Sequence, residues 1–173
     1  MDTFYYIGIK REEEEALIES FIEYDQVRLN KAEFTPTEPF EMEITEGSRL
    51  YDIVGFQDTS NFAISERLYN LLQEHRITGW KGYEISIKGV EEKYYGFQVV
   101  GRCGKLEQPK EAGFYMGYKF DYNSWDKSDL FSPDETVLLF CTQKVRDLLK
   151  KNKITNVELT DISKVQAYSI GTE

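Results

Sequence analysis

Residues 62–79 read FAISERLYNLLQEHRITG, and residues 139–156 read LFCTQKVRDLLKKNKITN. The two stretches align without a gap, and aligned residues lie 77 positions apart throughout, as Ile77 and Ile154 do. Apolar, capping and turn residues all keep this spacing, which is typical of a duplicated structural unit. The chain is therefore predicted to contain the same small unit twice.

Each copy predicts a strand, a helix and a second strand. A short apolar run precedes Ser65 or Thr142, and both residue types favour the N-cap of a helix. Apolar residues then recur at the i, i+3, i+4 spacing of a helix with one buried face. These residues are Leu68, Leu71 and Leu72 in the first copy and Val145, Leu148 and Leu149 in the second.

The helix of each copy is followed by Gly79 or Asn156, residue types that tolerate a positive φ where the chain turns. A second strand, at 83–87 or 157–162, closes each copy. The two strand-helix-strand units thus span about 62–87 and 139–162. Together with additional antiparallel strands at 4–10, 40–45 and 94–100, they predict an α+β fold. 

One further helix is predicted over residues 11–24. Residues 12–15 are four consecutive glutamates, which suit the positively polarised N-terminus of a helix. Leu17, Phe21 and Tyr24 follow at nearly helical spacing. The glutamates would then form a solvated helix face.

A chain of 173 residues is expected to form a single domain that buries roughly 70% of its unfolded surface. The aromatic-rich region 105–134 divides it into two similar halves, approximately 1–104 and 105–173. The aromatic side chains of this region must pack somewhere. The pattern leaves open whether they join the core or form a recognition surface.

The formal net charge of −10 opposes binding to nucleic acid or to an anionic membrane, and suits a basic protein partner. No segment approaches the roughly 20 apolar residues of a membrane span, and the N-terminus lacks the basic stretch of a signal peptide. Cys103 and Cys141 have no metal-type spacing and are expected to be reduced thiols. The sequence therefore predicts a cytoplasmic protein.

No catalytic residue is expected, and the chain is predicted not to be an enzyme. His75 is the only histidine, but the second copy carries Asn152 at the same place, and asparagine cannot act as a base. A capping role at the end of a helix explains both residues.

No metal or other cofactor is expected either. The segment from Asp121 to Asp126 begins like a calcium loop, but Trp125 occupies a ligand position and the turn glycine is missing. The glycines around Arg102 match no phosphate-binding loop.

Several motifs resemble a family of predicted bacterial immunity proteins, which carry domains of uncharacterised function and occur beside polymorphic toxins. The resemblance covers roughly residues 50–168 and lies in core and turn positions. The motifs are Phe62-x-Ile64-Ser65, Leu71-Leu72, Ile77-Thr78-Gly79-Trp80, Tyr95-x-x-x-Val99-x-Gly101-Arg102, Trp125-Asp126-x-Ser128-Asp129-Leu130-Phe131 and Ile154-Thr155-Asn156-Val157.

The resemblance implies an immunity protein that binds and neutralises a cognate toxin in the cytoplasm. The acidic charge suggests a basic toxin, and carboxylates without a structural task are the candidate contacts. The predicted partner-binding residues are Glu12, Glu13, Glu14, Glu15, Trp125, Asp126 and Asp129.

Two other functions stay open at the level of sequence, as does the oligomeric state. A divalent-metal-dependent hydrolase would use Asp121, Asp126 and Asp129, the most plausible carboxylate cluster. A small-ligand-binding module would instead use an apolar pocket between the two halves.

Overall fold

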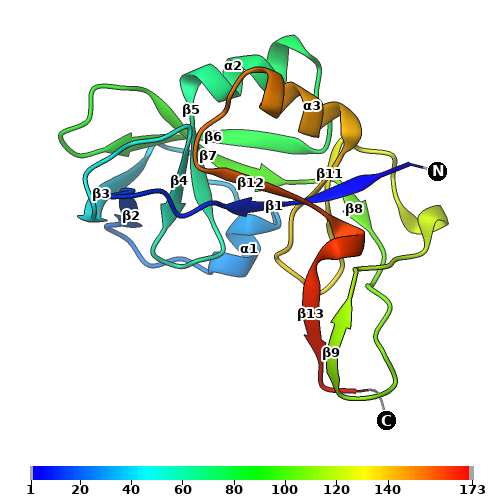
Figure 1. The fold of residues 1–173 in the computed structure, drawn as a ribbon. Coiled ribbons are helices and arrows are strands. Elements are labelled where there is room, and N and C mark those ends of the chain that lie inside the picture. Colours follow the sequence, from blue (N-terminus) through cyan, green and yellow to red (C-terminus); the bar gives the residue numbers. More distant parts are fainter. Residues whose placement is uncertain (1, 172–173) are drawn as a thin grey trace.

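The computed structural model describes residues 2–171, and 13 strands, three α-helices and two 3-10 helices are found in this range (Figure 1). Strand residues outnumber helical ones, 38% against 17%, so the α+β prediction is confirmed and the fold is mostly β. The strands are β1 (Phe4–Ile9), β2 (Leu17–Ser20), β3 (Phe40–Glu46), β4 (Ile53–Phe56), β5 (Phe62–Ser65), β6 (Trp80–Ile87), β7 (Tyr94–Val99), β8 (Arg102–Cys103), β9 (Gly113–Met116), β10 (Leu130–Pro133), β11 (Phe140–Thr142), β12 (Val157–Asp161) and β13 (Gln166–Ser169). The helices are α1 (Gln26–Asn30), α2 (Glu66–Glu74), η1 (Tyr122–Ser124), α3 (Gln143–Lys151) and η2 (Ile162–Lys164).

The strands form three groups. Six strands close a barrel in the order β2-β3-β6-β7-β5-β4, and five form an open sheet in the order β12-β1-β11-β10-β8. The remaining pair, β9 and β13, makes a two-stranded ribbon. Figure 1 shows the ribbon extending away from the body, with α2 and α3 on the opposite side.

The duplication predicted from sequence is confirmed in the strand register. Ile53 of β4 lies opposite Ile64 of β5, and Leu130 of β10 lies opposite Cys141 of β11, with the same offset of 77 between the two pairs. Helices α2 and α3 follow β5 and β11 directly, and they pack into one shared hydrophobic cluster. The repeated unit is therefore a real element of the architecture.

The strand that completes each unit comes from an unexpected part of the chain. Tyr95 of β7 lies opposite Ile64 in the first unit, whereas Tyr5 of β1 lies opposite Cys141 in the second. On its other side, β1 pairs with β12 in the same register that β7 adopts with β6. We therefore define the first unit as β4, β5, α2, β6 and β7, and the second as β10, β11, α3, β12 and β1.

This pairing is an exchange of strands within one chain. Taken in chain order, β1 opens the first repeat and β7 opens the second, yet each inserts into the sheet of the other repeat. The correspondence extends to β2 and β8, which pair in parallel with β4 and β10 respectively. Division of the chain near residue 104 stays a prediction, but β1 belongs by its pairing with the strands of the C-terminal part.

The two sheets differ in closure. Strand β3 pairs with β2 on one side and β6 on the other, and so completes the barrel. In the second sheet, β12 ends at the 3-10 helix η2, and the chain continues into the ribbon. The aromatic-rich region 105–134 is accordingly divided: Phe120 and Trp125 join a core cluster, while Phe114 and Met116 of the ribbon are exposed.

The helix predicted over residues 11–24 is wrong. Arg11 and Glu14 have positive φ, which a right-handed helix does not allow. The chain instead turns and enters β2. Ala16, just before this strand, and Ile18 within it are buried, whereas Glu19 is exposed. Burial at every second residue is typical of a strand. The helix was predicted from the spacing of Leu17, Phe21 and Tyr24, which does not show this alternation.

The apolar faces of α2 and α3 pack against the core as expected, but one pair of equivalent residues differs in burial. Leu68, Leu72 and Leu148 are buried, but Leu71 is only partly buried, so the equivalent residues Leu71 and Leu148 differ in burial.

Between residues 2 and 171, no helix has both the length and the apolar character to cross a membrane.

Candidate functional site

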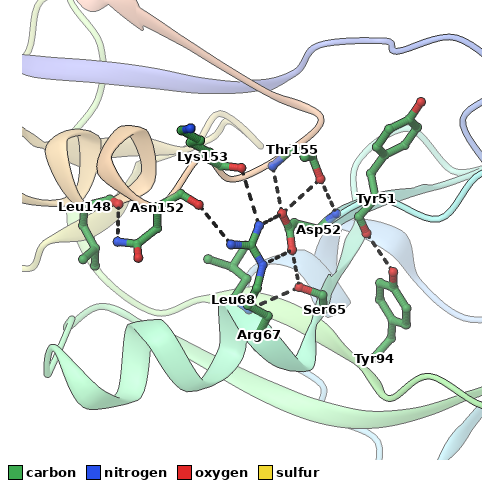
Figure 2. A network of polar contacts seen from close by, with 10 residues as sticks. All are labelled: Tyr51, Asp52, Ser65, Arg67, Leu68, Tyr94, Leu148, Asn152, Lys153 and Thr155. Carbon is green, nitrogen blue, oxygen red and sulfur yellow. Dashed lines mark hydrogen bonds and ion pairs between the residues drawn. The ribbon is translucent and has the colours of Figure 1, made fainter.

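Asp52, just before β4, is the centre of the polar network shown in Figure 2. Thr155, in the turn after α3, donates to Asp52 Oδ2 from its backbone N (2.9 Å) and from Oγ1 (3.0 Å). Ser65 Oγ donates to Oδ1 (2.7 Å), and Arg67 forms an ion pair with the same carboxylate. Arg67 also donates to the carbonyl of Asn152 (2.9 Å) at the end of α3. The network thus joins the first unit to the turn of the second.

Burial alone would raise the pKa of Asp52, whose side chain is 8% exposed. The hydrogen bonds from Arg67, Thr155 and Ser65 outweigh burial and hold its pKa below the ordinary value. Asp52 is therefore a stably ionised structural group, and not a carboxyl with a raised pKa that would suit a general acid.

Asp129, just before β10, repeats this arrangement in the opposite direction. Thr78, in the turn after α2, donates to Asp129 Oδ2 from its backbone N (3.0 Å) and from Oγ1 (3.2 Å). Lys144 of α3 takes the place of Arg67, with Nζ 3.0 Å from Oδ2. We call Asp52 and Asp129 the crossed carboxylates, because each one holds the turn of the other unit.

This geometry gives Asp129 a structural task. The expectation that Asp126 and Asp129 lack such a task is wrong, because Asp126 Oδ2 also accepts from the backbone N of Arg102 (2.9 Å) and Oδ1 from that of Ser128 (2.9 Å). Trp125 is 8% exposed and packs against Phe4 with ring centroids 4.9 Å apart. Contact of Trp125, Asp126 and Asp129 with a partner stays a prediction. Their contacts within the chain already account for their positions.

The glutamates at 12–15 lie in the turn before β2. Glu15 accepts from Asn156 Nδ2 (2.8 Å) and pairs with Arg11, so it too has a structural task. Glu12 pairs with Lys10, whereas Glu13 and Glu14 expose their side chains. Of the predicted contacts, these last two carboxylates are the ones most available to a partner.

The carboxylates proposed for a metal site do not come together. Asp121 caps η1 by accepting from the backbone N of Asn123 (3.0 Å), while Asp126 and Asp129 serve other backbone groups. Within residues 2–171, no group of three or more His, Cys, Asp and Glu side chains has a metal-binding arrangement.

The single histidine and the two cysteines occupy positions that the fold explains. His75 is the C-cap of α2, as Asn152 is of α3, which confirms their equivalent placement. Cys103 and Cys141 are buried free thiols. Burial raises the pKa of Cys103 to about 12 and also raises that of Cys141, so neither sulfur has the lowered pKa of an activated nucleophile.

A cavity of about 220 Å³ lies between the two units, on the side of β1 that faces the barrel. Its wall combines apolar side chains such as Phe62 and Phe97 with the polar groups of Asn30, Asn61 and Glu158. A pocket between the halves was expected to be apolar. This one is of mixed character, which suits a small ligand with polar groups.

The most distinctive surface of the barrel was missed by sequence reasoning. Phe21 and Ile22, which follow β2, are 52% and 61% exposed, and we call this pair the ridge. Glu19, Glu41 and Glu43 lie beside it on β2 and β3, and none of them forms an ion pair within the described chain. Acidic and apolar side chains are thus exposed together.

A signal for this surface was present in the sequence. The residues Glu19-Ser20-Phe21-Ile22-Glu23 place two large apolar side chains between acidic ones. Assignment of residues 11–24 to a helix put Phe21 on its buried face, and so concealed the exposed pair.

Comparison of the chain with family models and with curated proteins found no match.

Proposed function

We propose that this chain is an immunity protein that binds a basic cognate toxin and neutralises it. The sequence resemblance suggests the class, and the uncompensated acidic face of the barrel supports a protein partner with positive charge. The proposal needs direct binding without turnover, and it places the protein in the cytoplasm, where the toxin would act.

The observation that carries the proposal is the pairing of Glu19 with Glu43 across β2 and β3. Like charges directly opposite each other destabilise an antiparallel ladder. Glu41 lies two residues away on the same strand and is exposed, while Glu43 is partly exposed. These carboxylates therefore weaken the fold locally, whereas basic side chains of a partner would relieve their repulsion on binding.

The charge distribution also favours rapid capture. A surface of one sign raises the rate of encounter with a partner of opposite sign, up to about 10⁸–10⁹ M⁻¹s⁻¹ at low salt. Screening shortens to about 8 Å at 0.15 M salt, so association is expected to slow as salt rises.

Co-expression with the product of the adjacent gene tests the function. The protein is expected to rescue cells from that toxin and not from unrelated toxins. The double variant Glu19→Gln/Glu43→Gln should protect less well, while its thermal stability stays equal or rises. Glu74→Gln/Glu92→Gln removes the same charge from other exposed positions and serves as the control.

Purified protein that fails to bind the adjacent product, and instead turns over a small molecule, would contradict the proposal. Equal loss of protection in both double variants would show that net charge matters, and not the barrel face.

The cavity between the units favours a second candidate function, a small-ligand-binding module. Native mass spectrometry of the purified protein would then reveal a co-purifying small molecule. Ser60→Trp, which adds a bulky side chain to the cavity wall, should abolish that adduct. A spectrum with no adduct in either protein would count against this alternative.

A further inference from the structure

The ridge divides two hollows on the outside of the barrel. One hollow, of about 550 Å³, is formed with the segment from Phe34 to Glu41. The other, of about 470 Å³, is formed with Glu19, Glu23 and the loop at Asp58. Phe21 and Ile22 line both hollows, so an object resting on the ridge would reach into each of them.

The walls of the two hollows have one sign of charge. Glu38 and Glu41 line the first, and Glu19, Glu23 and Asp58 line the second. No lysine or arginine contributes to either wall. The nearest basic residues along the chain are engaged elsewhere: Arg28 lies 3.9 Å from Glu33, and Lys31 donates to the carbonyl of Pro133.

The ridge is held in place by its backbone and by its neighbours. Phe21 N donates to the carbonyl of Glu41 (3.2 Å), and Ile22 N donates to Ser20 Oγ (3.1 Å). Tyr24 then packs edge-on against Phe40 and donates to Asp58 Oδ2 (2.6 Å). The exposed pair is therefore fixed before binding, which lowers the entropic cost of docking.

We propose that the ridge and its two hollows form the docking surface for a basic protein segment. Apolar side chains of the segment cover Phe21 and Ile22, and flanking lysine or arginine side chains enter the acidic hollows. This inference rests on the proposed function in taking the toxin as the source of the segment. It adds the place and the mode of contact.

The charge of this surface distinguishes it from the ribbon, the other exposed apolar region. Phe114 and Tyr168 of the ribbon are 75% and 59% exposed and pair across β9 and β13. The neighbouring loop carries Lys110 and Glu111, so the ribbon offers no single sign of charge. A basic partner therefore gains electrostatic attraction at the ridge and not at the ribbon.

An NMR titration tests the surface without knowledge of the toxin. The probe is a capped hexapeptide with two lysines on each side of a Leu-Phe pair, and the control probe has glutamates in place of the lysines. Shifts are expected at Phe21, Ile22 and Phe34 with the lysine probe alone, and they should weaken as salt is added. Shifts confined to the ribbon, or none at all, would overturn the inference.

A pair of matched variants extends the test to the toxin. Phe21→Ser/Ile22→Ser removes the ridge, and Phe114→Ser/Met116→Ser removes an apolar pair of the ribbon that is at least as exposed. We expect the first to weaken toxin binding by at least about tenfold and the second to leave it unchanged. Circular dichroism checks that both variants fold.

The outcomes separate the two proposals. If the Phe21→Ser/Ile22→Ser variant binds the toxin as tightly as the wild type does, the docking surface is refuted and the immunity function is not. Failure of the wild type to bind the adjacent product, combined with lysine-probe shifts at the ridge, would refute the toxin as partner and support a different basic segment.

Discussion

The barrel and the open sheet contain the same unit with the same strand register. The six strands of the barrel form a closed ring, whereas the five strands of the other sheet leave it open at both edges. The difference lies in one strand. In the barrel β3 joins β2 to β6, whereas the second sheet has β12 and β8 at its edges. The shared unit therefore sets the strand pairing near the helices, and the segment inserted between β2 and β4, which contains β3, decides the outer shape.

The difference also separates structural from exposed carboxylates. The crossed carboxylates belong to the repeated part and serve both units alike. Glu19 and Glu41 are exposed and Glu43 is partly exposed; they belong to β2 and to β3, the strand that closes the barrel. Strand β3, which has no counterpart in the second sheet, thus contributes to the proposed docking surface through Glu41, and β2 contributes through Glu19.

Removal of β1 is the most severe test of how the two sheets compare, because it affects the second sheet directly. This strand lies between β12 and β11, so a chain lacking residues 1–10 loses an internal strand of its second sheet. We expect the truncated protein to be unfolded at 25 °C, because a typical domain is stable by only about 5–15 kcal/mol and the deletion leaves both β11 and β12 without their β1 partner. A synthetic peptide of residues 1–11 should restore folding, as monitored by circular dichroism.

The same peptide with Ile7→Asp provides the control, since it places a charge in the shared cluster. Cooperative unfolding of the truncated chain without any peptide would show that the exchange of strands is dispensable.

Truncation of the equivalent leucines should have unequal effects. Leu148→Ala is expected to cost about 2–5 kcal/mol, because it removes a buried core side chain. Leu71→Ala should cost about 1–2 kcal/mol, because Leu71 is only partly buried. Urea denaturation of both variants measures the difference, and equal costs would mean that their environments match after all.

The more deeply buried of the two crossed carboxylates should contribute more to the free energy of unfolding. Asp52→Ala is expected to cost about 3 kcal/mol and Asp129→Ala about 1–2 kcal/mol. Asp52 is 8% exposed and pairs with arginine, whereas Asp129 is 15% exposed and pairs with lysine. A larger cost for Asp129→Ala would reverse this ranking.

The contribution of Asp52 should also depend on pH. Its pKa is lowered on folding from the ordinary 3.8, so its stabilisation is complete above that value and is lost as pH falls through the lower folded pKa. The gap in melting temperature between the wild type and Asp52→Ala should therefore narrow below about pH 4.

His75→Asn is the gentlest test of the equivalence. The second unit already carries Asn152 at the C-cap of its helix, where the side-chain Nδ2 donates to the carbonyl of Leu148 (2.9 Å). We expect a stability change within about ±0.5 kcal/mol and unchanged protection of cells. Loss of activity in a folded variant would reopen a catalytic role for His75.

The repeat was visible in the sequence because its signals are local. Capping residues, the helical stripe and the turns at Gly79 and Asn156 all lie within 18 residues of chain. The exchange of β1 and β7 was not visible. Strand pairing depends on contacts distant in sequence, and the offset of the exchanged strands is 90, as Tyr5 and Tyr95 show, because the segment before β4 is longer than its counterpart.

The candidate contacts failed for a related reason. Asp126 and Asp129 were chosen as carboxylates without partners, but their partners are backbone groups of Arg102 and Thr78. Such bonds join segments that are distant in sequence, so composition and spacing do not reveal them. Exposure of Phe21 likewise became visible once residues 17–20 were placed in a strand.

The place of β1 also affects how the protein is made. Tyr6 pairs with Phe140 and Thr160, so β1 leaves the ribosome well before its partners, which are encoded more than 130 residues later. At about 5–20 residues per second, this delay is on the order of ten seconds. During synthesis the second unit remains incomplete, and β1, β11 and β12 can pair only once β12 has been translated. If the proposed function holds, protection comes only from chains translated through β12, because shorter chains lack a complete second unit.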